Sequence, residues 1–212
     1  MRFRSVFSFY ISTIQEMLKA HFNFNKAVIA KILVIFIISY IAFAALWVQV
    51  KDSYGYTVTL VGSKFAAALK NAQLEDIVKG KDLIHTSFRP LTKKQDVLFP
   101  VTIPTYVYTS NVPMTFAVMA SLYLFIGRKL RACTEAFLIL FAIHLLYVFS
   151  FETMQITYAF MKSGIETPDK FRFSFYQFLW AFTDFMFVRF GAFFIGIYVY
   201  LRFIRPAGEK LS

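Results

Sequence analysis

Residues 27–50, AVIAKILVIFIISYIAFAALWVQV, decide the fold class of this chain. Lys31 is the only charged residue in the run, and its long side chain can reach the lipid headgroups from near the start of a helix. A helix needs about 20 such residues to cross the hydrocarbon core of a bilayer. The run therefore predicts a first membrane-spanning helix over residues 27–50.

The composition of the whole chain agrees with a partly lipid solvent. Of the 212 residues, 58% are hydrophobic and 20% are aromatic, and the mean hydropathy is +0.57, which is more apolar than ordinary soluble domains. The net charge of +11 would favour nucleic acid as the partner of a soluble protein. Here Lys and Arg gather at the ends of apolar runs, where they orient a membrane protein. We therefore expect the lipid bilayer as a partner and no nucleic-acid binding.

Three later segments predict three further spans. Residues 111–127 begin with Asn-Val-Pro, a good helix start, and residues 133–152 follow a basic turn. The helix of this third span can continue to residue 163. The last span covers residues 174–202, where Ser174 and Gln177 fit a capping box. At about 1.5 Å per residue this segment is longer than the hydrocarbon core, so it is expected to tilt or protrude.

Residues 51–110 are mixed and polar, which predicts a small folded domain between the first two spans. Residues 56–61, YTVTLV, alternate like a strand, and Ser63 is placed to cap a helix from residue 64 to about 78. Further strand-like pieces lie at 83–88, 97–103 and 105–109. A domain of about 60 residues is near the lower limit for independent folding, so we expect it to lean on the membrane helices or on a partner.

The two ends of the chain are expected on the cytoplasmic side. Apolar residues recur at helical spacing over 5–24, which predicts a cytoplasmic amphipathic helix within residues 1–26, lying either on the membrane surface or on the protein. Ser8 and Ser12 interrupt its apolar character, so we do not expect a cleaved signal peptide. Basic residues in this segment, in the 127–132 turn and in a cytoplasmic tail over 203–212 fall on one side of a four-span protein.

The predicted fold is therefore an all-α membrane protein. It has four transmembrane helices, an N-terminal amphipathic helix and a small α+β extracytoplasmic domain.

Ionisable residues inside spans are costly and are candidates for a partner- or ligand-binding site. The candidates are His144, Glu152, Asp184 and Arg189. One interpretation is a polar cluster between the third and fourth spans, with Arg189 bonded to Asp184 or Glu152 and to His144. The other is that Glu152 and Asp184 reach the outer interface and Arg189 forms a structural ion pair. Because Asp184 and Arg189 are five residues apart, they share an α-helix face poorly, which predicts a partner for Arg189 on another helix.

Catalytic and metal chemistry have little support in the sequence. Cys133 is the single cysteine and lies eleven residues before His144, about 16 Å along a continuous helix, so the two cannot form a nucleophile–base dyad there. The three histidines lie in three separate regions. We expect no catalytic residue, no metal and no cofactor. Ala192 and Gly196 form a small-xxx-small pair, which predicts close helix packing.

Residues 110–151, SNVPMTFAVMASLYLFIGRKLRACTEAFLILFAIHLLYVFSF, resemble the exosortase-associated membrane proteins of Gram-negative bacteria. The likeness lies in a span that opens Asn-Val-Pro-Met at 111–114, in the basic turn at 128–131 and in a following span that carries His144. The resemblance implies a bacterial inner-membrane protein that assists a protein-sorting or envelope-export system. Exosortases themselves carry Cys, Arg and His in that order, whereas this chain has Cys133, His144 and Arg189, so their catalytic roles are not transferred.

Three functions follow as expectations. The first is a non-catalytic accessory or scaffold protein that binds a membrane-protein partner through its extracytoplasmic domain and transmembrane helices. The second is a subunit of a transporter or export complex in which the level of His144 and Arg189 lines a path. The third is an intramembrane thiol enzyme that uses Cys133 with groups from another chain.

Overall fold

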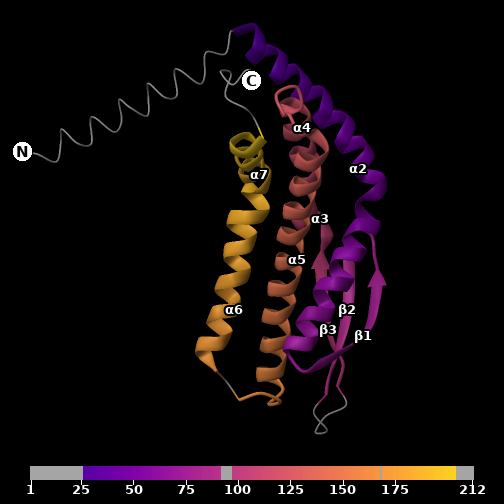
Figure 1. The fold of residues 1–212 in the computed structure, drawn as a ribbon. Helices are drawn as coiled ribbons and strands as arrows, with labels where there is room; N and C mark the ends of the chain where they lie inside the picture. The colour runs from indigo at the N-terminus through magenta and orange to yellow at the C-terminus, as the bar shows by residue number, and fades with distance from the viewer. Residues whose placement is uncertain (1–25, 92–96, 168, 204–212) are drawn as a thin grey trace, which may run out of the picture.

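The computed structural model describes residues 26–91, 97–167 and 169–203. The chain is mostly helical and carries one small three-stranded sheet (Figure 1). Among these residues, three helices are long and apolar enough to cross a membrane: α2 (Lys26–Leu69), α5 (Lys129–Lys162), and a continuous helix built from α6 (Lys170–Phe182), the π-helical segment η1 (Thr183–Val188) and α7 (Arg189–Phe203). The predicted amphipathic helix in residues 1–26 and the tail in 203–212 lie almost wholly outside the described residues.

The first helix is much longer than the predicted 27–50 span. α2 has 44 residues and continues through the stretch predicted as a strand at 56–61, so that prediction was wrong, as was the helix start at Ser63. The buried residues of this half recur at helical spacing: Gly55, Val58, Thr59, Gly62, Ser63, Ala66 and Ala67. Six residues with alternating polarity are too few to distinguish a strand from a helix. The small buried residues that recur at helical spacing over 55–67 indicate the helix.

The sheet is antiparallel in the order β1-β2-β3, with β1 at Ala72–Lys79, β2 at Leu83–Pro90 and β3 at Phe99–Pro104. The predicted strand at 83–88 is confirmed, and the one predicted at 97–103 is confirmed from residue 99 onward. The helix predicted from residue 64 to about 78 was right only up to Leu69, because residues 72–78 form β1. The strand predicted at 105–109 was wrong, because these residues form the short helix α3 (Thr105–Thr109). Asn71, with φ 47°, follows the end of α2 and allows the chain to turn back along it.

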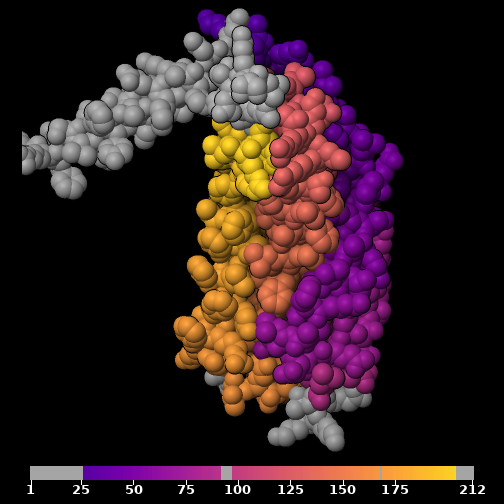
Figure 2. All heavy atoms as spheres, viewed as in Figure 1, coloured from indigo at the N-terminus to yellow at the C-terminus, as the bar shows by residue number. Residues whose placement is uncertain are grey.

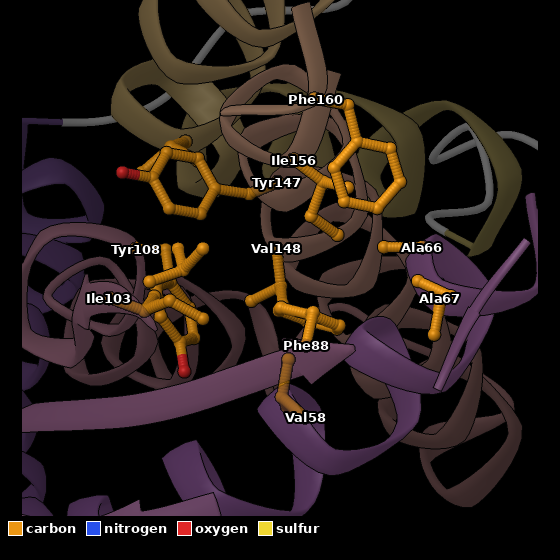
Figure 3. Close-up of a cluster of buried hydrophobic side chains, with 13 residues drawn as sticks. Val58, Ala66, Ala67, Phe88, Ile103, Tyr108, Tyr147, Val148, Ile156 and Phe160 are labelled. Atoms are coloured by element: carbon orange, nitrogen blue, oxygen red, sulfur yellow. The ribbon is translucent and has the colours of Figure 1, made fainter. Parts of the chain in front are cut away.

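One face of the sheet covers the pair formed by the second half of α2 and the second half of α5. Figure 3 shows the side chains that meet in this core: Val58, Ala66 and Ala67 from α2, Phe88 and Ile103 from the strands, and Val148, Ile156 and Phe160 from α5. The predicted small domain therefore does lean on a long helix, and α5 supplies a large part of its core.

The predicted second span at 111–127 contains a helix of only 11 residues, α4 (Val112–Leu122). At 1.5 Å per residue α4 is about 16 Å long, roughly half of the hydrocarbon core. It follows α3 directly, after a turn at Ser110 and Asn111, and packs between α2 and α7. Pro113 stands in its first turn, where a missing N–H is tolerated.

The last two long helices run antiparallel along the molecule, and α6–α7 packs alongside α4 and α5 in the space-filling view (Figure 2). The predicted continuation of the third span is confirmed, because α5 ends at Lys162. The capping box predicted at Ser174 was wrong. Asp169 caps the helix instead, accepting hydrogen bonds from the backbone N–H groups of Phe171 and Arg172 at 3.1 Å each.

Candidate functional site

The four ionisable residues predicted for a common site lie in three separate groups. Arg189 contacts Asp184, His144 bonds to Tyr54 and Asn111, and Glu152 bonds to Ser63 and Thr86. The structure therefore does not bring His144, Glu152 and Arg189 together.

Arg189 pairs with a residue of its own helix, contrary to the prediction of a partner on another helix. Its Nη2 lies 3.3 Å from Oδ2 of Asp184. Residues 183–188 are π-helical, and the N–H of Arg189 donates to the carbonyl oxygen of Asp184 five residues earlier. A π turn places residues i and i+5 above one another, whereas an α turn separates them. The Arg189 side chain is 63% exposed and that of Asp184 is 19% exposed.

His144 is the centre of a buried hydrogen-bonded chain. Asn111 Nδ2 donates to the carbonyl oxygen of Val188 at 2.8 Å, which leaves Asn111 Oδ1 to accept from His144 Nε2 at 2.9 Å. His144 Nδ1 is then the acceptor for the Tyr54 hydroxyl at 2.7 Å. Complete burial favours the neutral imidazole, whose single proton is then on Nε2. The chain links α2, α5, the start of α4 and the end of η1.

A cavity of about 400 Å³ opens beside this chain. It lies between α3, the start of α4 and η1, and its lining residues are Tyr106, Val107, Ser110, Asn111, Met114, Asp184, Val188 and Arg189. The cavity therefore joins the Asp184–Arg189 pair to Asn111, the residue that also bonds to His144. π-helical turns are frequent at functional sites, which makes this cavity the leading candidate for ligand binding.

Glu152 is fully buried between the helices and the sheet. Its Oε1 accepts hydrogen bonds from Ser63 Oγ of α2 at 2.8 Å and from Thr86 Oγ1 of β2 at 2.9 Å. Its Oε2 has no hydrogen-bond partner among the residues that the structure describes. The prediction that Glu152 pairs with Arg189 was wrong, because its partners are Ser63 of α2 and Thr86 of β2.

Several residues of the buried polar network were missed by the sequence analysis, among them Tyr54, Thr59 and Tyr108. Tyr108 of α3 donates to the carbonyl oxygen of Gly55 at 3.1 Å and lies 3.1 Å from the hydroxyl of Thr59. Burial raises the pKa of the Tyr108 phenol, so it remains a neutral donor. Gly55 and Thr59, the two partners of Tyr108, share one face of α2 only when residues 51–69 form a helix. The strand predicted there concealed this signal.

The remaining predicted residues have packing contacts. Cys133 is half-buried against the apolar cluster of α4, α5 and α7. Ala192 is buried on α7, and a Cβ placed at Gly196 would lie 2.8 Å from Cγ1 of Val118 on α4, so the two helices approach closely at this point.

Chemically, the described residues include buried hydrogen-bonded groups around His144, Glu152 and Tyr108, and the Asp184–Arg189 ion pair beside a cavity. Within 26–91, 97–167 and 169–203, no three His, Cys, Asp or Glu side chains come together as metal ligands. No family model, no curated protein and no solved structure matches this chain.

Proposed function

We propose that this chain is a non-catalytic membrane-spanning scaffold of a bacterial protein-sorting or envelope-export system. It binds a membrane-protein partner through its sheet-bearing half. The observation that carries this proposal is the contrast between the two halves of α2. The most apolar stretch of α2, near the N-terminus, has no buried residue, whereas the second half buries a face of small residues against the sheet and α5.

The contrast supports a lipid environment for the first half. Large apolar side chains are exposed along this stretch, including Leu33, Ile38, Ile41 and Val48. A helix that exposes so many large apolar side chains is stable only in lipid or when another protein covers it. The second half, by contrast, belongs to a packed core of the kind found outside the bilayer.

The placement of basic residues supports an orientation. The start of α2 and the end of α7 lie at one end of the molecule, and the sheet lies in the other half (Figure 1). The basic turn before α5 is at the same end of the molecule as the last residue of α7, because the N–H of Gly127 donates to the carbonyl oxygen of Phe203. These ends are cytoplasmic by the distribution of Lys and Arg, and the sheet is extracytoplasmic.

The hydrogen bonding of His144 and Glu152 supports a structural role over a catalytic or transport role. Both side chains are fully buried and join different elements of the fold. The buried position of His144 gives no support to a transport path at its level. Cys133 lies against apolar neighbours, so a thiol enzyme also lacks a supporting contact.

A strip of phenylalanines on α6 supports a partner beside the sheet-bearing half. Phe171, Phe175, Phe178 and Phe182 recur at helical spacing and are exposed, and α6 has no buried residue. At the level of the sheet these side chains would face water. The strip continues into exposed phenylalanines on η1 and α7, Phe185, Phe190 and Phe193. A partner that covers both parts must itself be a membrane protein.

Three measurements test the proposal. Carbonate washing is expected to leave the chain in membranes, and reporters inserted beside Gly80 and at the C-terminus are expected in different compartments. A photocrosslinking residue at position 171 or 178 is expected to trap a protein in native membranes, whereas the same residue at position 41 is expected to trap lipid. Carbonate extraction of the chain, or lipid alone at positions 171 and 178, would overturn the proposal.

A further inference from the structure

Arg189 carries a charge that the protein itself balances only in part. A guanidinium has five N–H donors, and its contact with Asp184 is a single one at 3.3 Å with most of the side chain exposed. Arg189 lies thirteen residues before Arg202, about 20 Å along the helix from the cytoplasmic end. At that depth a charged group is costly unless it reaches the headgroup region and finds a partner there.

The geometry directs Arg189 toward the outer headgroups. Asp184 lies closer to the extracytoplasmic end of the helix than Arg189, so the guanidinium extends outward to meet it. Tyr106, which is 58% exposed, lines the same cavity, and tyrosine is enriched at membrane interfaces. The cavity thus lies where the headgroups of the outer leaflet would be, if the chain spans the membrane as proposed above.

The walls of the cavity match an amphipathic ligand. Asp184, Arg189 and Ser110 are polar, whereas Val107, Met114 and Val188 are apolar. Asn111 forms part of the wall with both ends of its amide already bonded, to His144 and to Val188. This anchoring holds α4 against η1 without a ligand, so the cavity is preformed.

We infer that this cavity binds the headgroup of a zwitterionic phospholipid that bears a primary ammonium, of the phosphatidylethanolamine type. The lipid phosphate accepts hydrogen bonds from Arg189, and its ammonium donates to Asp184. A purely anionic headgroup would place its negative charge beside Asp184 without an ammonium to pair with it. A choline headgroup has no N–H to donate to this carboxylate. The inference rests on the membrane placement in the proposed function.

Native mass spectrometry of the full chain, released from detergent, tests the inference. Ethanolamine, choline and glycerol phospholipids with the same acyl chains are added in turn, with soluble phosphoethanolamine as a headgroup without chains. We expect the ethanolamine lipid to bind roughly tenfold more tightly than the other two lipids. Equal binding of the three lipids would overturn the inference. Binding of phosphoethanolamine as strong as that of the whole lipid would also overturn it, because it would indicate a site for a soluble metabolite.

Variants separate the two charges. Arg189→Gln is expected to weaken binding of the ethanolamine lipid roughly tenfold, and Asp184→Asn to remove its advantage over the choline lipid. Arg202→Gln is the matched control, because Arg202 lies on the same helix at the cytoplasmic end, and it is expected to bind like the wild type. Unchanged lipid binding in both cavity variants would overturn the inference.

One more variant tests the site in case the charge variants do not fold. Ser110→Trp fills the cavity from an exposed position without removing either charge, and it is expected to lose the ethanolamine lipid while its melting temperature stays near that of the wild type. A folded Ser110→Trp protein that keeps the lipid contradicts the site. Carbonate washing keeps the two proposals apart: a chain that stays in membranes but shows no lipid preference refutes only the lipid site.

Discussion

Gly62 of α2 lies so close to Val148 of α5 that a Cβ at this glycine would be 2.7 Å from Cγ1 of Val148. The two helices touch here beside the core that also contains the sheet. A Cβ at Gly62 would also lie 2.9 Å from Cβ of Val148, so Val148 or the backbone beside it would have to move.

Replacing Gly62 is therefore expected to weaken the fold. Gly62→Ala should lower the free energy of unfolding by about 1–3 kcal/mol through overpacking, although alanine normally favours a helix over glycine. Thermal unfolding in detergent, followed by tryptophan fluorescence, measures the effect. Ala68→Val adds carbon atoms at an exposed position of the same helix and should melt like the wild type. A Gly62→Ala protein as stable as the wild type would show that α2 and α5 are not this close.

Glu152 is expected to tolerate an amide but not truncation. Glu152→Gln keeps an oxygen that can accept from Ser63 and Thr86, so a loss below about 1 kcal/mol is expected. Glu152→Ala removes the acceptor from two buried hydroxyls and leaves a cavity, at a cost of about 2–5 kcal/mol. The melting temperatures of the two variants in detergent, each compared with that of the wild type, measure these losses. Equal losses in both variants would mean that these two hydrogen bonds do not hold the sheet to the helices.

His144 is expected to matter through its two hydrogen bonds. His144→Phe preserves a ring but leaves the Tyr54 hydroxyl and the Asn111 amide oxygen without a partner, at a cost of about 1–3 kcal/mol for each group. His85→Phe is the matched control. It removes an exposed hydrogen bond to Thr102 on the sheet and should change stability by less than about 0.5 kcal/mol. Similar melting temperatures for the two variants would contradict the buried chain.

Asp169 is expected to stabilise the start of α6. Asp169→Ala removes the acceptor for the N–H groups of Phe171 and Arg172 and should cost about 1 kcal/mol. Asp169→Ser retains a capping oxygen and should recover most of that loss. Hydrogen exchange of the first turn of α6 measures the effect locally. If Asp169→Ala and Asp169→Ser exchange alike, the cap has no energetic role.

Local patterns in the sequence were sufficient to predict several elements correctly. The apolar run at 27–50 lies in a helix, α5 continues to Lys162, and strands occur at 83–88 and 99–103. These segments are long or strongly patterned, so their own composition and periodicity decide their conformation. The small-residue spacing of Ala192 and Gly196 likewise indicated a close helix contact, because glycine lets two backbones approach.

Tertiary contacts decided the rest. Residues 51–69 continue α2 because their small residues pack against α5 and the sheet. A few consecutive residues of sequence contain no information about either of these distant partners. The partners of His144 and Glu152 come from residues 33 to 90 positions away in the chain, so periodicity along α5 could not reveal them. Asp184 meets Arg189 because η1 adds a residue to one helical turn. The sequence by itself thus determined which segments are apolar helices, whereas packing between distant segments determined where α2 ends and which polar groups meet.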